Sequence, residues 1–220
     1  MINILGNQYQ IDEKWCFSAL KKYILPSHKV VIIPFSFYDQ SIHSVETWQE
    51  AYGKIDGRYY SEIVNPLLSY GINEASIHWV NYFEDTKAEA KRKIEEADIL
   101  YFTGGLPDKM MDRLIEFNLI DAIREHSGIV IGFSAGAMIQ MGTYHVTPDE
   151  DYESFGFYRG LGLIDTFDIE VHFEHTRLQL DCIHKAIEES GLPVYAMEEN
   201  GALIVDHGKV TTMGKVHYYG

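Results

Sequence analysis

The sequence has few of the residues that mark several protein classes. Only two of its 220 residues are cysteines, Cys16 and Cys182, which is too few for a disulfide framework and gives no metal-ligand spacing. Basic residues are also scarce, since 18 Lys and Arg stand against 33 Asp and Glu, and the formal net charge is -15. This charge opposes binding to a phosphate backbone or to an anionic membrane surface. We therefore expect a protein of the reducing cytoplasm that binds neither nucleic acid nor membrane.

Long hydrophobic runs are absent as well. No apolar segment approaches the ~20 residues that a bilayer requires, and the N-terminal segment has no basic region followed by a long apolar stretch. The chain is long enough for one sizeable core, and it contains no repeat, linker or low-complexity tract. The sequence predicts one soluble domain over residues 1–220.

Short β-branched runs alternate with longer segments of helical period. The runs lie at 29–35, 76–83, 98–105 and 128–134. The longer segments lie at 85–97, with Asp85 as the expected N-cap, at 107–126 and at 181–191. This alternation predicts an α/β three-layer sandwich, in which helices cover both faces of a mostly parallel sheet.

The pattern changes towards the C-terminus. The runs "PVYAMEE", "GALIVDHG" and "KVTTMGKVHYYG" are short, with glycine-bearing turns between them, and they predict an antiparallel ribbon with a turn at Asn200 and Gly201. Residues 142–162 show little periodicity, so we expect an acidic solvated loop there, or a lid over a site.

The stretch "GIVIGFSAGAM" delivers one serine to a tight turn at the end of an apolar strand. Gly132, Ser134 and Gly136 match the G-x-S-x-G pattern of a nucleophile elbow, in which a strand ends, the serine occupies a strained turn and a helix begins. A serine hydroxyl is a weak nucleophile at neutral pH, so it needs a histidine as base and usually a carboxylate to hold that histidine. The pattern also fits a plain strand-to-helix turn with a buried serine.

Two sets of partners for Ser134 compete. In an open parallel sheet the chemistry gathers beyond the carboxyl ends of the strands, which favours His172 with Glu199 or its neighbour Glu198. The order typical of α/β-hydrolases would instead pair the serine with Asp165 or Asp168 and a late histidine. That histidine would be His207. Since little parallel sheet follows the serine, the first set fits better.

Four ordered motifs give the chain a family resemblance. "YFTGGLPDKM", "GFSAGAM", "VHF" and "MEENGALIV" together resemble the serine peptidase family that contains dipeptidase E and cyanophycinase. That family is similar in fold to class I glutamine amidotransferases. The resemblance implies a hydrolase that cuts a small peptide, which can carry an N-terminal aspartyl residue, through an acyl-enzyme and without cofactor or metal. A cyanophycinase-like enzyme, an α/β-hydrolase-type esterase or amidase, and a non-catalytic amidotransferase-like binding protein are the alternatives.

The resemblance also assigns roles. It implies Ser134 as nucleophile, His172 as base and Glu199, more than Glu198, as the acid. Elbow geometry and the family pattern both suggest the Ala135 amide as an oxyanion donor, with a second donor from Gly104 or Gly105. The segment after these glycines departs from the family's usual polar one, which leaves the aspartyl preference open.

Two further features concern ligands. Arg177 follows the base by five residues and could bind a substrate carboxylate, although it could equally pair with Glu174 or Asp181 on a helix surface. The segment "HFEH" places His172 and His175 around Glu174, but it is not the H-E-x-x-H pattern and has no recognisable third ligand. We therefore expect no metal site.

Overall fold

The parallel part of the sheet forms where the sequence is most apolar. The computed structural model describes all 220 residues. Its five parallel strands are β1 (Ile2–Gly6), β2 (Val30–Ile33), β3 (Ile77–Trp79), β4 (Ile99–Phe102) and β5 (Ile129–Phe133). Every residue of β2, β4 and β5 is buried, as expected for strands that are covered on both faces.

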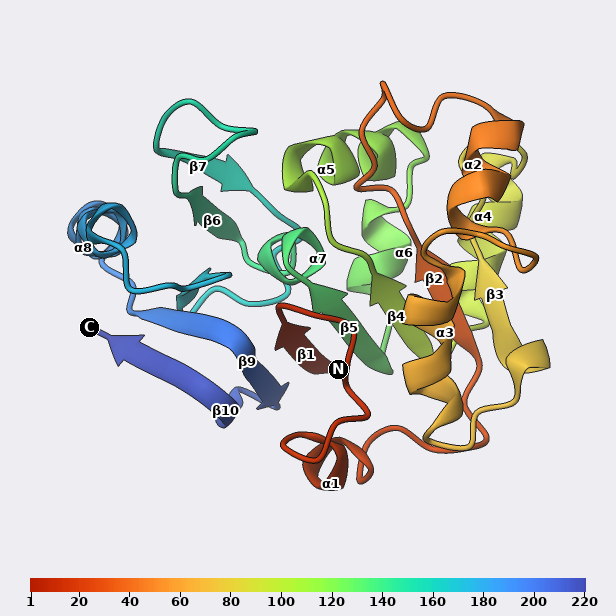
Figure 1. Cartoon of the computed structure of the whole chain (residues 1–220), viewed down its shortest axis with the longest axis horizontal. Helices are drawn as coiled ribbons and strands as arrows, with labels where there is room; N and C mark the ends of the chain where they lie inside the picture. The colour runs from red at the N-terminus through yellow and green to blue at the C-terminus, as the bar shows by residue number, and fades with distance from the viewer.

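Three later strands complete the sheet. They are β8 (Asp168–Glu170), β9 (Val194–Asp206) and β10 (Lys209–Tyr219). The order is β10-β9-β1-β5-β4-β2-β3, with β8 paired to β9, and β9 and β10 are antiparallel to their neighbours β1 and β9. Figure 1 shows β9 and β10 at the end of the sheet opposite β2 and β3.

Helices cover both faces of the sheet and bury two large apolar clusters. One face is covered by α1 (Phe17–Leu20), α2 (Val45–Tyr52) and α3 (Tyr60–Leu68), and a short 3-10 helix, Glu74–Ser76, precedes β3. The other face is covered by α4 (Lys87–Glu95), α5 (Pro107–Glu116), α6 (Ile120–Arg124) and α7 (Ala135–Met138). Alternate residues of β5 point into the two clusters: Val130 lies in one, and Ile129 and Ile131 lie in the other. The expected three-layer α/β fold is confirmed.

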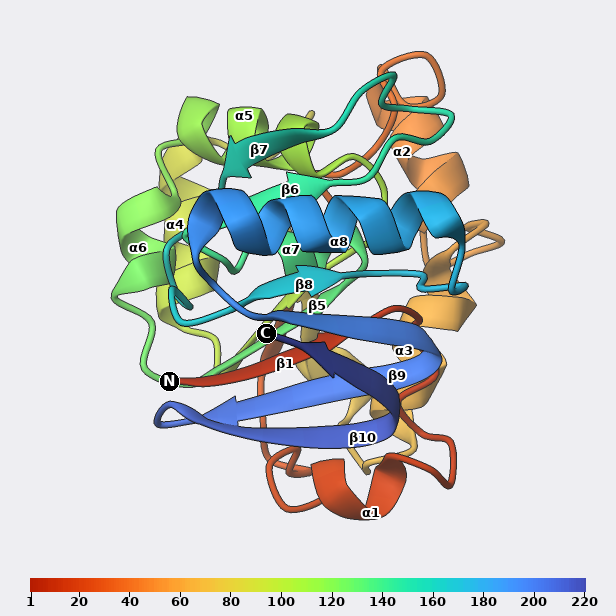
Figure 2. The same ribbon diagram turned by 90° about the vertical axis from the view of Figure 1, so that its left-hand side faces the viewer.

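The last helix and a small hairpin lie beyond the parallel strands. Helix α8 (Arg177–Ser190) packs Ile183 and Ala186 against Val194 and Ala196 of β9. Figure 2 shows α8, β8, β9 and β10 one below another on one side of the molecule. Strands β6 (Thr143–Val146) and β7 (Gly156–Arg159) form a separate two-stranded sheet. Residues 142–162 therefore contain a hairpin and are not the irregular loop that their weak periodicity predicted.

Several element boundaries differ from the sequence prediction. The helix after β3 is capped by Thr86 and not by Asp85, because Thr86 and Glu89 form a reciprocal capping box. The segment 107–126 forms two helices, since Asn118 adopts a left-handed conformation with φ 57°. The predicted turn at Asn200 and Gly201 is wrong, because β9 runs through both residues.

The sequence analysis also missed β1. This strand lies between β5 and β9, and Ile4 pairs with Ile131 on one side and Ile204 on the other. It joins the parallel strands to the antiparallel C-terminal ones. No helix of the structure combines the length and the apolar character needed to cross a membrane.

Candidate active site

Ser134 occupies a strained turn between β5 and α7. Its backbone has φ 49° and ψ −114°, a region that residues other than glycine seldom adopt. Two hydrogen bonds hold the turn from the strand side and the helix side: the Ser134 N–H donates to Gly6 O at 2.8 Å, and Ser134 O accepts from the Ala137 N–H at 2.9 Å. This is the geometry of the predicted nucleophile elbow.

The two glycines of the motif allow α7 to approach the sheet closely. A Cβ atom at Gly132 would lie 1.9 Å from Gly136 O, and one at Gly136 would lie 2.4 Å from Phe102 O. Both contacts involve backbone atoms that cannot move aside, so a larger residue at either position would displace the helix. Glycine is therefore required here by the elbow itself.

His172 lies beside the serine at the end of β8. Its Nε2 is 2.9 Å from Ser134 Oγ, and its Nδ1 is 3.4 Å from Glu199 Oε2. Glu199 reaches this edge because antiparallel β9 brings Ala202, three residues later, opposite Gly6 at the carboxyl end of β1. The structure thus brings together the serine, the histidine and the carboxylate that the sequence analysis preferred.

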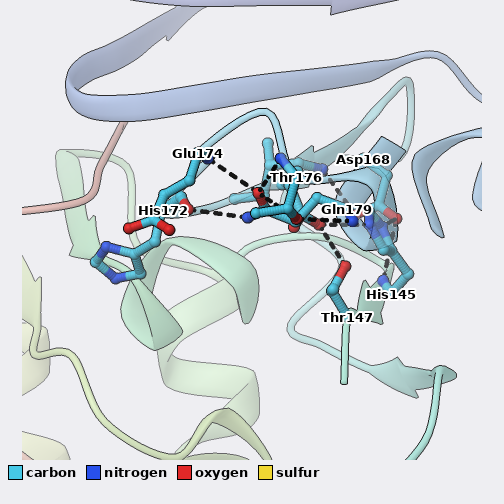
Figure 3. A network of polar contacts seen from close by, with 9 residues as sticks. His145, Thr147, Asp168, His172, Glu174, Thr176 and Gln179 are labelled. Carbon is cyan, nitrogen blue, oxygen red and sulfur yellow. Dashed lines mark hydrogen bonds and ion pairs between the residues drawn. The ribbon is translucent and has the colours of Figure 1, made fainter. Parts of the chain in front are cut away.

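Two amide side chains hold the backbone of His172, which has φ 50°. Its N–H donates to Asn7 Oδ1 at 3.2 Å, and its carbonyl accepts from Gln179 Nε2 at 2.9 Å. Asn7 also donates to Met197 O and to Glu198 O, both at 2.7 Å. Figure 3 shows Gln179 between the backbone of His172 and that of Glu174. The sequence analysis missed Asn7 and Gln179, because a lone amide residue carries no motif.

The carboxylates of Glu198 and Glu199 have different partners in the structure. The Glu198 carboxylate accepts hydrogen bonds from His175, His217 and Lys215, which lower its pKa to about 2. It makes no contact with His172. Of the two neighbouring glutamates, only Glu199 has its carboxylate on the imidazole of His172.

The amide groups near Ser134 differ in their freedom to bind an oxyanion. The Gly104 N–H already donates to the Tyr9 hydroxyl at 2.8 Å. The Ala135 N–H lies in the first turn of α7, where amides have no acceptor within the helix. Gly105 has φ 133°, and a Cβ there would lie 2.3 Å from Ser36 O. Of these three amides, only that of Gly104 already donates to an acceptor within the chain.

The alternative partners of Ser134 lie elsewhere. Asp168 is buried and binds His145, with 2.6 Å between its Oδ2 and Nδ1 of the ring. His207 lies in the turn between β9 and β10, where its exposed ring pairs with Asp206. The order typical of α/β-hydrolases is therefore not assembled in this structure.

The comparisons with known proteins identify the family of the chain. The sequence matches peptidase family S51 over residues 27–213. The chain belongs to this family. It is 28% identical to Peptidase E of Haemophilus influenzae over 172 residues, which are 73% of this chain and 75% of that protein. The resemblance drawn from the four motifs is confirmed, and S51 membership makes the chain a peptidase of the dipeptidase E type.

Two crystal structures share the fold of this S51 chain. One is a protein from Listeria monocytogenes EGD-e provisionally assigned as a peptidase E, with a TM-score of 0.68, 19% identity and coverage of 96% of both chains. The other is a peptidase from an acI-B1 Actinobacterium, with a TM-score of 0.67, 18% identity and coverage of 99% of this chain and 90% of that one.

Ser134 and His172 line a cavity of about 720 Å³. Its lining contains no Lys or Arg and five carboxylates, namely those of Asp149, Glu150, Asp151, Glu170 and Glu174. Three of these belong to the segment between β6 and β7, which Tyr38 and Asp108 hold through hydrogen bonds to Asp151 and Tyr152. That segment is therefore a wall of the cavity.

Arg177 does not line this cavity. Its side chain is 87% exposed at the start of α8, and its guanidinium pairs with Asp181 one turn later. This is the helix-surface pairing that the sequence analysis held as the alternative. Its position gives no support to the expected role in binding a substrate carboxylate.

A buried histidine belongs to the cavity wall. His145 is fully enclosed between Asp168, 2.6 Å from its Nδ1, and Glu170, 2.8 Å from its Nε2, as Figure 3 shows in part. Burial, the largest single influence, would lower the pKa of His145, but the hydrogen bonds and the charge attraction of the two carboxylates together outweigh it and raise the pKa to about 9. The ring is therefore a cation at neutral pH that neutralises part of the acidic wall.

The charge on His145 predicts a pH-dependent stability. Its folded pKa lies above the unfolded value of about 6.5, so its contribution is complete below that pH and is lost as pH rises through about 9. We expect the free energy of unfolding in urea to fall by about 2.5 kcal/mol between pH 7 and pH 10. His207→Ala should show the same fall. A flat profile, or an NMR titration of His145 below pH 7, would contradict this account.

Proposed function

We propose that this chain is a serine peptidase in which Ser134, His172 and Glu199 hydrolyse a peptide bond through an acyl-enzyme. The observation that carries the proposal is the 2.9 Å contact between His172 Nε2 and Ser134 Oγ at the strained elbow. In this geometry the imidazole can remove the hydroxyl proton while the oxygen attacks the scissile carbonyl. Membership of peptidase family S51 supports the same chemistry.

The remaining groups would stabilise charge as the reaction proceeds. The amides of Gly105 and Ala135 would donate to the oxyanion, with Gly104 as a third donor if Tyr9 releases it. His172 would then transfer its proton to the leaving amine, and the bond between Ser134 Oγ and the acyl carbon would remain. In the second half of the reaction the same imidazole would take a proton from water as the water oxygen attacks the ester. The imidazole would then give this proton to Ser134 Oγ as the bond to the acyl carbon breaks.

Glu199 would orient His172 and stabilise its cationic form. The contact of 3.4 Å between Glu199 Oε2 and Nδ1 is longer than an ideal hydrogen bond, and both side chains are about half exposed. Substrate binding that excludes water from this edge would strengthen the interaction. Catalytic contacts are often long before substrate binds.

The charge of the cavity bears on the substrate. Five carboxylates line it, with no Lys or Arg and with the buried His145 cation as a partial offset, so it favours a positively charged group such as the free amino group of a small peptide. An N-terminal aspartyl side chain would bring a further negative charge to the same wall.

The two cysteines, Cys16 and Cys182, are both free thiols, which is consistent with action in the reducing cytoplasm.

Ser134→Ala tests the proposal directly. Loss of the nucleophile should lower kcat against the best substrate of a dipeptide library, which includes Asp-X members, by at least about a thousandfold. The melting temperature should hardly change, because only one hydroxyl oxygen of a partly buried residue is removed. Undiminished turnover by the folded variant would contradict the proposal. A wild-type protein that hydrolyses no peptide of the library would support a non-catalytic protein of the same fold.

Glu199→Gln tests the third member of the proposed catalytic triad. The amide keeps the shape but removes the charge that stabilises the protonated imidazole, so we expect kcat to fall by about a hundredfold. Glu198→Gln should lower kcat less, since that carboxylate makes no contact with His172. Asp165→Asn and His207→Ala serve as controls and should keep wild-type kcat. An essential His207 together with a dispensable His172 would make the alternative order correct.

A further inference from the structure

Three side chains with metal-binding atoms converge outside the cavity that contains Ser134. Nε2 of His175 lies 3.0 Å from Glu198 Oε1, and Nε2 of His217 lies 2.8 Å from the same oxygen. All three potential ligand atoms are within 4.8 Å of one another. The geometry points to a binding site for a divalent transition-metal ion formed by these three residues, and Zn²⁺ is the ion that their chemistry fits best.

The ligand set is a known type for zinc. Two imidazole nitrogens and one carboxylate oxygen provide three protein ligands, and water can take the fourth position. At ordinary bond lengths, tetrahedral zinc separates neighbouring ligand atoms by about 3.3 Å. The two imidazole nitrogens now lie slightly closer than this to the oxygen that they share, at 3.0 and 2.8 Å. Their ring protons would lie on Nδ1, which leaves the Nε2 lone pairs for the ion.

The register of the C-terminal hairpin brings two of the ligands together. His217 of β10 lies opposite Ala196 of β9. Because side chains alternate along a strand, Glu198 and Ala196 lie on the same face, and His217 is the diagonal neighbour of Glu198. These two ligands are thus held by the main-chain ladder of two long strands, β9 and β10, which lie in the foreground of Figure 2.

The buried ring of Phe173 packs against the imidazoles of His175 and His217. Phe173 donates its backbone N–H to Met197 O at 2.9 Å, which ties the loop after β8 to β9. Its ring is 2% exposed and lies with its centroid 4.4 Å from that of His175 and 5.7 Å from that of His217. Apolar packing therefore limits the orientations of both histidines before any ion binds.

The charges around the cluster suit a cation. Lys215 pairs with Oε2 of Glu198 at 3.0 Å, so it fixes the carboxylate and leaves Oε1 for the ion. The ammonium repels a divalent ion, but the net charge of -15 favours one over the molecule as a whole. An ion here would link the loop that follows His172 to the hairpin. We therefore expect it to raise the melting temperature.

Titration of the metal-free full-length chain with Zn²⁺ tests the site. Calorimetry should show one high-affinity ion per chain, and Zn²⁺ should raise the melting temperature. His175→Asn and His217→Asn should each weaken binding by at least about tenfold, since even the loss of an indirect partner costs that much. His207→Asn is the matched control, because it removes an exposed histidine from the other end of the same hairpin and should leave the affinity unchanged.

A cooperative thermal unfolding transition in EDTA establishes that each metal-free variant is folded. Because two ligand positions are substituted separately, the test still stands if one of the variants does not fold. Wild-type protein that binds no Zn²⁺, or binding that His175→Asn and His217→Asn leave at the wild-type level, would overturn the proposal. Loss of binding in His172→Asn alone would also overturn it, since the ion would then lie at Ser134. Because the readout is binding, the result does not depend on whether the chain is a peptidase.

Discussion

The close approach of α7 to the parallel sheet is the constraint on which the site depends. It needs Gly132 and Gly136 at the contacts and a left-handed backbone at Ser134 between them. A buried amide network supports the strained turn from below, because Gln140 binds Asn3 of β1 at 2.9 Å and the carbonyl of Gly136 at 3.3 Å. The serine is therefore held by the interior of the protein rather than by a mobile loop.

The proposed base and acid come from the C-terminal part of the sheet, outside β1 to β5. His172 follows β8, and Glu199 lies on β9. β1 joins the two parts, and Asn7, directly after it, binds the backbone of His172 and of two residues on β9. The histidine is thus fixed through its main chain, while its ring stays half exposed and can exchange protons with a substrate. Five carboxylates line the cavity beside it, and the buried His145 cation offsets part of their charge.

The sequence predicts those parts of the site that rest on local pattern. The elbow is readable because glycine spacing and strand hydrophobicity are local, and His172 is readable because it follows a strand end. Glu199 lies inside β9, and its choice over Glu198 rested on the family resemblance. The position of Arg177 outside the cavity, the role of Asn7 and the meeting of His175 with His217 depend on packing and register over long sequence separations. β1 escaped notice because it is short, and β9 is longer than its Asn-Gly pair suggested.

The most direct test of the account is the reaction of the folded protein with a phosphonofluoridate, followed by intact mass and peptide mapping. Such reagents modify a serine only when a neighbouring base activates it, as His172 is placed to do here. We predict stoichiometric labelling confined to Ser134, and none in the Ser134→Ala and His172→Ala variants. Wild-type protein that remains unlabelled, or that is labelled on another serine, would contradict the claim that this elbow is an active nucleophile.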